Sequence, residues 1–286
     1  MSNTINRITV KTSFGTDLSV IVAGEKQRPA VLLIHGFPNS ANGFRDVIPV
    51  LAQSAYVIAP DMPAYGQSEK LPVSTFDAYT TVFSELLDHL EVRSLFIYLH
   101  DFGAVPGIRL AMKAPERVLG LIIQNANAHR TGFGPLWKDT LEYWSHPNPQ
   151  NEAAAMMHLT LQGMRDQYVA GVPEDVAKKI APALWEEDWR VMSLPGHLDV
   201  QRKLITDYAT HAAQFDAIGD YLRTHQPPAL LLWGRHDAFF HIAETVSWME
   251  DLPRMEAHIF DAGHLMLETH AAPAATLIKN FIASVK

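Results

Sequence analysis

Short apolar runs alternate with stretches of helical periodicity along much of this chain. Runs of this length, bounded by polar or turn-forming residues, are typical of strands buried on both faces. Two polar–apolar alternating segments, Ile5–Thr12 and Asp17–Ala23, predict a pair of strands joined at Phe14–Gly15. We expect buried strands at Ala30–Ile34, Ala55–Ala59, Leu95–Leu99, Val118–Ile123, Ala229–Trp233 and Glu256–Phe260.

Helical periodicity fills the intervals between several of these runs. Apolar residues recur at helical spacing over Phe76–Leu90, and Val105–Lys113 follows the run that ends at Leu99. A closing helix is expected at Ala271–Val285. Strands that alternate with helices indicate an α/β protein with a mostly parallel, eight-stranded sheet flanked by helices on both faces.

The alternation stops after Asn127 and resumes at Ala229. The intervening chain is rich in Trp, Tyr, His and Met and is punctuated by Gly and Pro. We therefore predict a core of residues 1–128 and 227–286 and a helical cap, residues 129–226, that acts as a lid. The alternative is a second helical layer without a gating role. The expected cap helices are Leu141–Trp144, Glu152–Tyr168, Pro173–Trp189 and Leu198–Phe215.

The composition describes an ordinary globular protein. Of the 286 residues, 48% are hydrophobic and 19% charged, enough for a large core with a subdomain. A formal net charge of -8 disfavours nucleic acid and anionic membranes as partners, since both require basic patches. No apolar run approaches the roughly 20 residues of a membrane helix, and Met1–Gly15 lacks the apolar segment of a signal peptide.

The chain contains no cysteine. Disulfides, thiolate zinc sites and cysteine nucleophiles are therefore excluded. This composition fits a reducing compartment, and we expect a cytoplasmic protein. We expect neither a cofactor nor a metal.

A candidate nucleophile lies where a buried run turns into a helix. The run ending at Leu99 continues into His100-Asp101-Phe102-Gly103-Ala104, and a helix follows. A strand, a sharp turn and a helix form the context of a nucleophile elbow, whose middle residue carries the nucleophile. That residue is Asp101, although Leu99 replaces the first glycine of the pattern. Taken alone, the turn is equally compatible with Asp101 as a cap of the helix.

Two later turns supply the remaining parts of a catalytic triad. Asp237 follows the run that ends at Trp233, and His264 follows the run that ends at Phe260. Loops at the carboxyl ends of parallel strands are where sites form in open α/β sheets. We therefore expect His264 to be the general base and Asp237 to orient it, in the order nucleophile, acid, histidine.

Other polar residues near these strand ends leave alternatives open. Asp261, three residues before His264, is a second candidate for the orienting acid, although it is local to the histidine. Asn125 and Asn127 follow the run that ends at Ile123, another strand end where an acid could stand, but both are amides.

The loop His35-Gly36-Phe37-Pro38, after the run ending at Ile34, is a candidate oxyanion loop. A tight loop with glycine at this position can direct a backbone N–H at the reacting centre. We expect the amides of Phe37 and Phe102 to form the oxyanion hole. His35 is interpreted mainly as a residue that shapes the loop, and both His35 and Pro38 are expected beside the substrate.

The chain resembles the epoxide hydrolase and haloalkane dehalogenase branch of the α/β-hydrolases. The resemblance rests on five motifs that occur in the family's order: HGFP, DMPAYGQS, HDFG, GRHD and AGH. The resemblance covers the core from about residue 15 to the C-terminus. It implies that Asp101 attacks an sp³ carbon to form an alkyl-enzyme ester, which water activated by His264 hydrolyses. The implied partners are water and a small apolar epoxide or organohalide. We expect the protein to be a monomer or a homodimer.

Departures from the family pattern bear on the substrate. Haloalkane dehalogenases usually place Trp directly after the nucleophile, where its indole N–H holds the leaving halide, but this chain has Phe102 there. Their oxyanion loop often contains Asn as a second halide donor, where this chain has Phe37. Fluoroacetate dehalogenases place arginines where this chain has Phe102 and Val105. Neither Phe nor Val has a side-chain donor. An epoxide hydrolase that produces a diol is therefore our first hypothesis.

The resemblance implies two cap tyrosines that protonate the opening oxygen. Tyr208, in the segment Leu204-Ile205-Thr206-Asp207-Tyr208, resembles the second of them, and Tyr168 is a weaker candidate for the first. Each could instead simply pack the cap. Tyr143 and Trp144 are expected to contact the substrate.

Two other functions compete with this hypothesis. A dehalogenase could use an atypical halide site with indole donors from Trp137, Trp144, Trp185 or Trp189. A non-catalytic ligand-binding protein is disfavoured because it has no need to keep Asp101, Asp237 and His264 in order. Asp101 itself disfavours a serine esterase.

Overall fold

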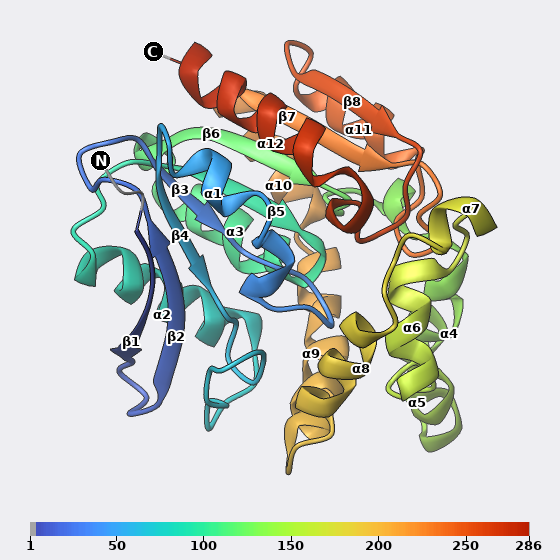
Figure 1. The fold of residues 1–286 in the computed structure, drawn as a ribbon. Coiled ribbons are helices and arrows are strands. Elements are labelled where there is room, and N and C mark those ends of the chain that lie inside the picture. Colours follow the sequence, from blue (N-terminus) through green and yellow to red (C-terminus); the bar gives the residue numbers. More distant parts are fainter. Residues whose placement is uncertain (1–3, 286) are drawn as a thin grey trace.

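The computed structural model describes residues 4–285. Its eight strands form one sheet in the order β1-β2-β4-β3-β5-β6-β7-β8 (Figure 1). β2 runs antiparallel to β1 and β4, and the pairs from β4 to β8 are parallel. The predicted fold class is confirmed. The strands are β1 (Ile5–Lys11), β2 (Asp17–Ala23), β3 (Ala30–Leu33), β4 (Tyr56–Pro60), β5 (Leu95–His100), β6 (Val118–Gln124), β7 (Ala229–Gly234) and β8 (Glu256–Phe260).

Burial explains why the central strands have nearly continuous apolar sequences. Every residue of β3, β4, β5 and β7 is buried, because helices cover both faces of the sheet. β1 and β8 lie at the two edges and are more exposed. The outer strands therefore carry polar residues that a central strand would not tolerate.

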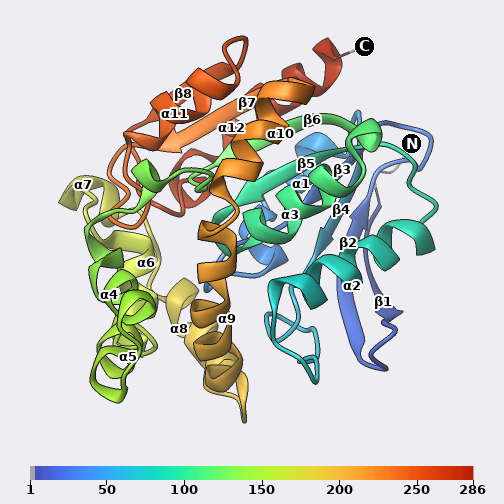
Figure 2. The ribbon, with the colours of Figure 1, turned by 180° about the vertical axis from the view of Figure 1, so that it is seen from behind.

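Helices pack on both faces of the sheet. α1 (Ile48–Leu51) and α12 (Leu267–Ser284) cover one face (Figure 1). The other face is covered by α2 (Phe76–His89), α3 (Asp101–Lys113), α10 (Phe215–His225) and α11 (Glu244–Asp251), which Figure 2 shows from behind. None of the described helices is long and apolar enough to cross a membrane.

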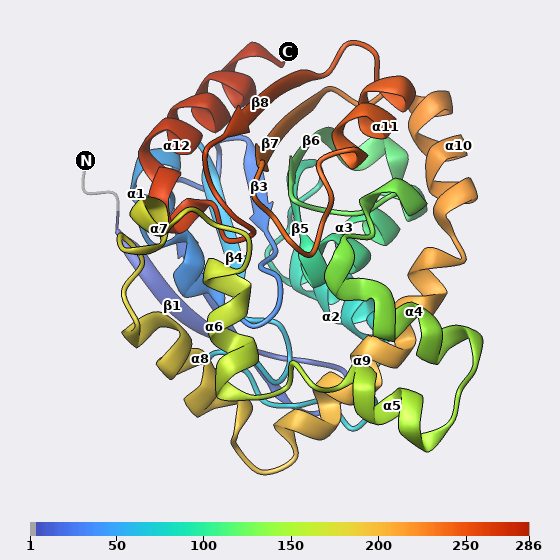
Figure 3. The ribbon, with the colours of Figure 1, turned by 90° about the vertical axis from the view of Figure 1, so that its right-hand side faces the viewer.

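The chain between β6 and β7 forms a helical insertion at the end of the sheet where β5 runs into α3 (Figures 1 and 3). Its last helix, α10, returns to the face of the sheet beside α3 and α11. Before α10, the insertion contains η3 (Arg130–Gly132), η4 (Pro135–Trp137), α4 (Lys138–Ser145), α5 (Pro149–Ala155), α6 (Leu161–Val169), α7 (Glu174–Ala177), α8 (Ala183–Met192) and α9 (His197–Ala212).

Two long helices expected in this insertion are each divided. Residues 152–168 form the end of α5 and most of α6, because the Thr160 side chain accepts a hydrogen bond from the Gly163 amide and starts a new helix. Residues 173–189 are likewise divided between α7 and α8, and Pro182 immediately precedes α8. These local caps override the apolar periodicity that spans both breaks.

The base of the insertion is attached to the loop that follows β7. The Gly134 amide donates to the Phe239 carbonyl at 2.8 Å, and Phe133 forms an isolated antiparallel bridge with Phe240. The start of the insertion and the loop that carries Asp237 are therefore held together by backbone hydrogen bonding.

Candidate active site

The turn between β5 and α3 holds Asp101 in a rarely used conformation. Its φ is 47°, in the left-handed region, which places its side chain above the end of the sheet. The turn packs closely against the loop after β3: a Cβ added at Gly103 would lie 2.3 Å from the His35 carbonyl oxygen. A Cβ added at Gly36 would lie 2.3 Å from the Asp101 Cβ. Only glycine fits at these two positions.

Backbone amides from two loops hold the Asp101 carboxylate. The Phe37 amide donates to Asp101 Oδ1 at 2.6 Å, and the Phe102 amide also hydrogen-bonds the carboxylate. Residue His100, not Asp101, occupies the N-cap position of α3. A cap of α3 would not account for the bond from Phe37, which belongs to another loop. The two amides lie where an oxyanion hole is required.

His264 stands between the two carboxylates. Its Nδ1 is 2.8 Å from Asp237 Oδ2, and its Nε2 is 3.6 Å from Asp101 Oδ2. The rings of Phe239 and Phe240 pack around the imidazole, with centroid distances of 5.4 and 5.2 Å. Nε2 hydrogen-bonds no other residue within the range 4–285. The free nitrogen is therefore directed at the candidate nucleophile at a distance too long for a direct hydrogen bond.

Asp237 is held by four donors. Its Oδ1 accepts from the amides of Phe239 and Phe240 at 2.7 and 3.0 Å. Its Oδ2 accepts from His264 and from Asn125 Nδ2, the latter at 2.8 Å. Asn125 Oδ1 in turn accepts from the Gly234 amide. Sequence reasoning noted Asn125 only as an amide near the site, so its supporting role was missed.

The alternative acid, Asp261, lies outside this arrangement. Its carboxylate is half exposed and is 2.8 Å from Arg235 Nη2 and 2.7 Å from His236 Nε2. Asp237, which contacts His264 directly, is the acid of the candidate triad.

The electrostatics of the site are set by burial and by these pairings. Burial disfavours the cationic form of His264, but the charge and hydrogen bond of Asp237 outweigh it, so the pKa of His264 is raised. Burial also raises the pKa of Asp101, against the opposing effects of His264 and the two amides. The imidazole becomes the neutral form required of a base as pH rises through its raised pKa.

A small cavity of about 40 Å³ lies beside Asp101. This is room for roughly three water molecules at ~10–15 Å³ each. Most of the lining residues belong to the helical insertion. Most of the cavity wall as a whole is apolar. The lining residues are Phe37, Asp101, Phe102, Leu136, Trp137, Thr140, His158, Gln167, Ile205 and Phe239.

Two hydrogen-bond donors near this cavity have no partner within residues 4–285. They are the indole nitrogen of Trp137, which lines the cavity, and the hydroxyl of Tyr208. The Tyr208 ring packs against Trp137 and Phe102, with centroid distances of 4.9 and 5.5 Å. Unpartnered buried polar atoms are rare in native proteins and call for an explanation.

His158 and Gln167 are polar residues of the cavity wall that the sequence did not indicate. Burial lowers the pKa of His158 to about 4, so its ring is neutral at pH 7. Its position depends on the break between α5 and α6, which brings the loop containing His158 against the core.

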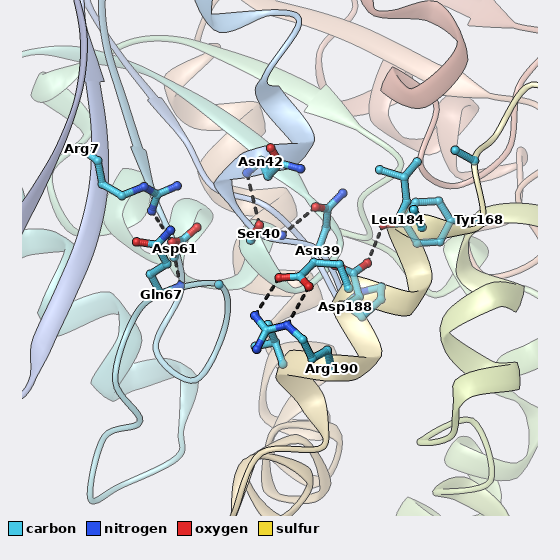
Figure 4. A pocket seen from close by; sticks show the side chains of 16 residues that line it. Arg7, Asn39, Ser40, Asn42, Asp61, Gln67, Tyr168, Leu184, Asp188 and Arg190 are labelled. Atoms are coloured by element: carbon cyan, nitrogen blue, oxygen red, sulfur yellow. Dashed lines mark hydrogen bonds and ion pairs between the residues drawn. The ribbon is translucent and has the colours of Figure 1, made fainter.

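The prediction that Tyr168 serves the reacting centre is wrong. Its hydroxyl donates to Asp188 Oδ2 at 2.5 Å, within a second cavity of about 430 Å³, here named the outer cavity (Figure 4). The adjacent residue, Gln167, lines the catalytic cavity instead. On α6 neighbouring residues point in different directions, and the sequence did not indicate which faces the core.

Four residues expected beside the substrate are also placed elsewhere. Both ring nitrogens of His35 contact the backbone of nearby loops. Nδ1 is 2.9 Å from the Gly36 carbonyl oxygen, and Nε2 accepts a hydrogen bond from the Met62 amide. These contacts fit the interpretation of His35 as a residue that shapes its loop. Pro38 lines the outer cavity. Trp144 donates to the Ile205 carbonyl, and Tyr143 packs half-buried against the core without lining the catalytic cavity.

The structure thus brings together Asp101, Asp237, His264, Phe37 and Phe102. The Tyr208 ring packs against Phe102, the residue that follows Asp101. No group of three or more His, Asp or Glu side chains suited to hold a metal occurs among residues 4–285.

Comparison with known proteins places this arrangement in a family. Residues 29–271 match the family described as alpha/beta hydrolase fold. An uncharacterized hydrolase of Saccharomyces cerevisiae is 32% identical over 291 residues, which cover 99% of each chain.

Solved structures of both expected activities share the fold. The epoxide hydrolase CorEH is 21% identical with a TM-score of 0.78, over 99% of this chain and 100% of that one. The haloalkane dehalogenase DbeA from Bradyrhizobium elkani is 22% identical with a TM-score of 0.74, over 99% of each chain. At these identities the likeness concerns the fold. This chain belongs to the alpha/beta hydrolase fold family and is a hydrolase.

Proposed function

We propose that this hydrolase uses Asp101 as its nucleophile and opens a small epoxide to a diol. The observation that carries the proposal is the environment of the Asp101 carboxylate. Oδ1 accepts the Phe37 amide at 2.6 Å, and Oδ2 lies 3.6 Å from His264 Nε2. One oxygen thus sits in an oxyanion hole and the other faces a base, beside a cavity.

In the first step, Asp101 Oδ2 attacks a ring carbon of the epoxide. The carbon–oxygen bond of the ring breaks, and the released oxygen takes a proton from a nearby donor. Ordinary carboxylates ionise near pH 4. Burial raises the pKa of Asp101, but His264 and the amides of Phe37 and Phe102 favour its ionised form. Once ionised, the carboxylate attacks as the nucleophile without a base.

In the second step, His264 Nε2 removes a proton from water, and the resulting hydroxide attacks the ester carbon of Asp101. Negative charge develops on the oxygen that faces the Phe37 and Phe102 amides, which stabilise it. Collapse breaks the ester bond, and the histidine returns its proton to the departing alkoxide. The products are the diol and Asp101 as a carboxylic acid. Its proton returns through solvent to the donor used in the first step, which restores the Asp101 carboxylate.

Tyr208 is the proposed proton donor in the first step. Its hydroxyl is fully buried and unpartnered within the described chain, and its ring contacts Phe102. Burial and the charge of Asp101 raise its pKa well above the ordinary value, so it holds its proton until a strongly basic alkoxide develops. A hydroxyl suits this task because it can transfer its proton, which an indole cannot do at neutral pH.

The free indole nitrogen of Trp137 favours a second candidate, a haloalkane dehalogenase. There Asp101 would displace a halide, and the indole N–H would hold the leaving ion. Trp137 lines the cavity, and its indole N–H has no hydrogen-bond partner among the described residues. The absence of a donor on Phe102 and Phe37 leaves Trp137 as the main candidate for this role.

Paired variants distinguish the two reactions. Purified wild type, Tyr208→Phe and Trp137→Phe are assayed with terminal epoxides and with bromoalkanes of the same carbon skeleton, for diol and for free bromide. For an epoxide hydrolase, we expect diol from wild type, a loss of roughly 10²–10⁴ in the ring-opening rate of Tyr208→Phe, and a smaller loss in Trp137→Phe.

Bromide release that depends on Trp137, without diol, would replace the epoxide assignment by the dehalogenase one. Diol formation that Tyr208→Phe leaves unchanged would remove Tyr208 from the mechanism. Absence of both products across the panel would favour the ligand-binding alternative.

A further inference from the structure

The outer cavity is distinct from the catalytic cavity, and the proposed reaction does not use it. Its volume of about 430 Å³ falls within the ~300–1,000 Å³ typical of small-molecule sites. It lies between α8 of the insertion and the loops that follow β3 and β4 of the core (Figure 4). Exposed residues such as Asn42 and Ala183 form part of its wall, so it opens to solvent.

Two of the carboxylates in this wall already have cationic partners. Asp61 Oδ2 is 2.6 Å from Arg7 Nη1, and Glu187 Oε2 is 2.7 Å from Arg190 Nε. Figure 4 shows both arginines directed at carboxylates within the cavity wall. These pairs leave no net charge for a ligand to balance.

Asp188, the third carboxyl group, has no such partner. Its side chain is more than nine-tenths buried, with a relative exposure of 8%, and it lines the cavity. The Tyr168 hydroxyl donates to Oδ2, and Oδ1 accepts no hydrogen bond from any residue in the range 4–285. One oxygen of a buried acid is thus left free at the cavity wall.

The groups around Asp188 disfavour the ionised form of its carboxyl group. Burial raises the pKa of Asp188 to about 8, and the carboxylates of Glu268 and Glu187 add to the effect of burial, while the Tyr168 bond opposes it. Arg45, the cation on the far side of Tyr168, is already paired with Glu268. No cation that is free of another partner therefore stands beside the Asp188 carboxyl group.

We propose that the outer cavity binds a small organic cation whose ammonium group pairs with Asp188 Oδ1. A hydrogen bond between an ammonium and a carboxylate is shorter and stronger than one between neutral groups. The remainder of such a ligand would lie against Asn39, Ser40 and Leu184, which supply polar and apolar wall. A divalent metal ion fits poorly, since it requires several oxygen ligands and only one carboxylate is uncommitted.

We expect that binding of an ammonium ligand releases a proton from the Asp188 carboxyl group. At pH 7 the carboxyl group of Asp188 is mostly protonated, and the ammonium takes the place of that proton. A neutral ligand of the same shape has no reason to displace it.

Isothermal titration calorimetry with n-butylammonium tests the proposal, in two pH 7 buffers that differ in ionisation enthalpy. The neutral isostere 1-butanol is the ligand control. We expect saturable binding with release of close to one proton. In Asp188→Asn, which keeps an acceptor for Tyr168, we expect binding at least about tenfold weaker and no proton release. Glu186→Gln, an exposed change on the same helix outside the cavity wall, should alter the affinity less than about twofold.

Thermal unfolding of each variant establishes that it is folded before titration. Absence of saturable binding by folded wild-type protein would overturn the proposal. So would equal affinity in Asp188→Asn, equal affinity for 1-butanol, or binding without proton release. Because the measurement is of binding and not of turnover, its result is independent of the epoxide assignment.

Discussion

Replacing His264 with glutamine should stop the proposed reaction halfway. The first step requires only the ionised Asp101, whereas the second requires a base at the position of Nε2, 3.6 Å from Asp101 Oδ2. A positioned general base contributes roughly 10²–10⁴ in rate, or about 3–5 kcal/mol of activation free energy. We therefore expect the ester on Asp101 to accumulate to nearly one per protein molecule.

The pH of this experiment matters because the substitution also acts on the nucleophile. Loss of the imidazole removes a charge that lowers the pKa of Asp101, while burial continues to raise it. The carboxylate is then lost as pH falls through its raised pKa, and ester formation slows at low pH. Alkylation should therefore be measured over a series of pH values that extends to the alkaline side, which favours the ionised carboxylate.

Mass spectrometry of the intact variant and of its Asp101 peptide provides the measurement. An epoxide adds its whole mass, whereas an alkyl halide adds its mass less that of the hydrogen halide, so the adduct also identifies the reaction. The double variant Asp101→Ala/His264→Gln is the control and should carry no adduct. An adduct on another residue, or turnover by His264→Gln at the wild-type rate, would refute the two-step reasoning.

Three further changes test the surroundings of the site. Asn125→Ala removes a hydrogen bond to the Asp237 carboxylate, and kcat should fall roughly 10- to 150-fold, the equivalent of about 1.5–3 kcal/mol; unchanged kcat would exclude a supporting role. Gly103→Ala places a methyl group 2.3 Å from the His35 carbonyl oxygen and should destabilise the fold by ~1–3 kcal/mol in urea unfolding, which an unaltered midpoint would contradict. Because the folded-state pKa of Asp188 is raised to about 8, the folded protein binds one more proton than the unfolded chain between about pH 4 and 8. This group should therefore lower the free energy of unfolding as pH rises, by at most about 1.4 kcal/mol per pH unit. Urea unfolding of Asp188→Asn should lack this contribution.

The core of the site could be predicted because it depends on local turns at strand ends. Asp101, Asp237 and His264 each follow a buried strand, and parallel strands bring their carboxyl ends to one edge. The turn around Asp101 was recognisable because a buried strand ends there and a helix follows directly. Chain order and turn chemistry therefore indicated the triad before any packing was known.

The wall of the cavity could not be predicted in the same way. Whether Gln167 or Tyr168 faces Asp101 depends on the rotation of α6, which follows from where Thr160 starts that helix. Apolar periodicity showed that the insertion is helical but did not show which helix faces the core. Asn125 was missed for a related reason: its value lies in contact with Asp237, which is distant in the sequence.

The attachment of the insertion to the loop after β7 has a mechanical consequence. The same loop that bonds to Gly134 presents the amides of Phe239 and Phe240 to Asp237 Oδ1. An insertion that swung about Phe133 would pull on the loop that holds Asp237, so opening of the cavity and alignment of His264 would be coupled. Substitutions at this pivot should change the pH dependence of the reaction together with its preference for substrate size, although none of them would touch a reacting atom.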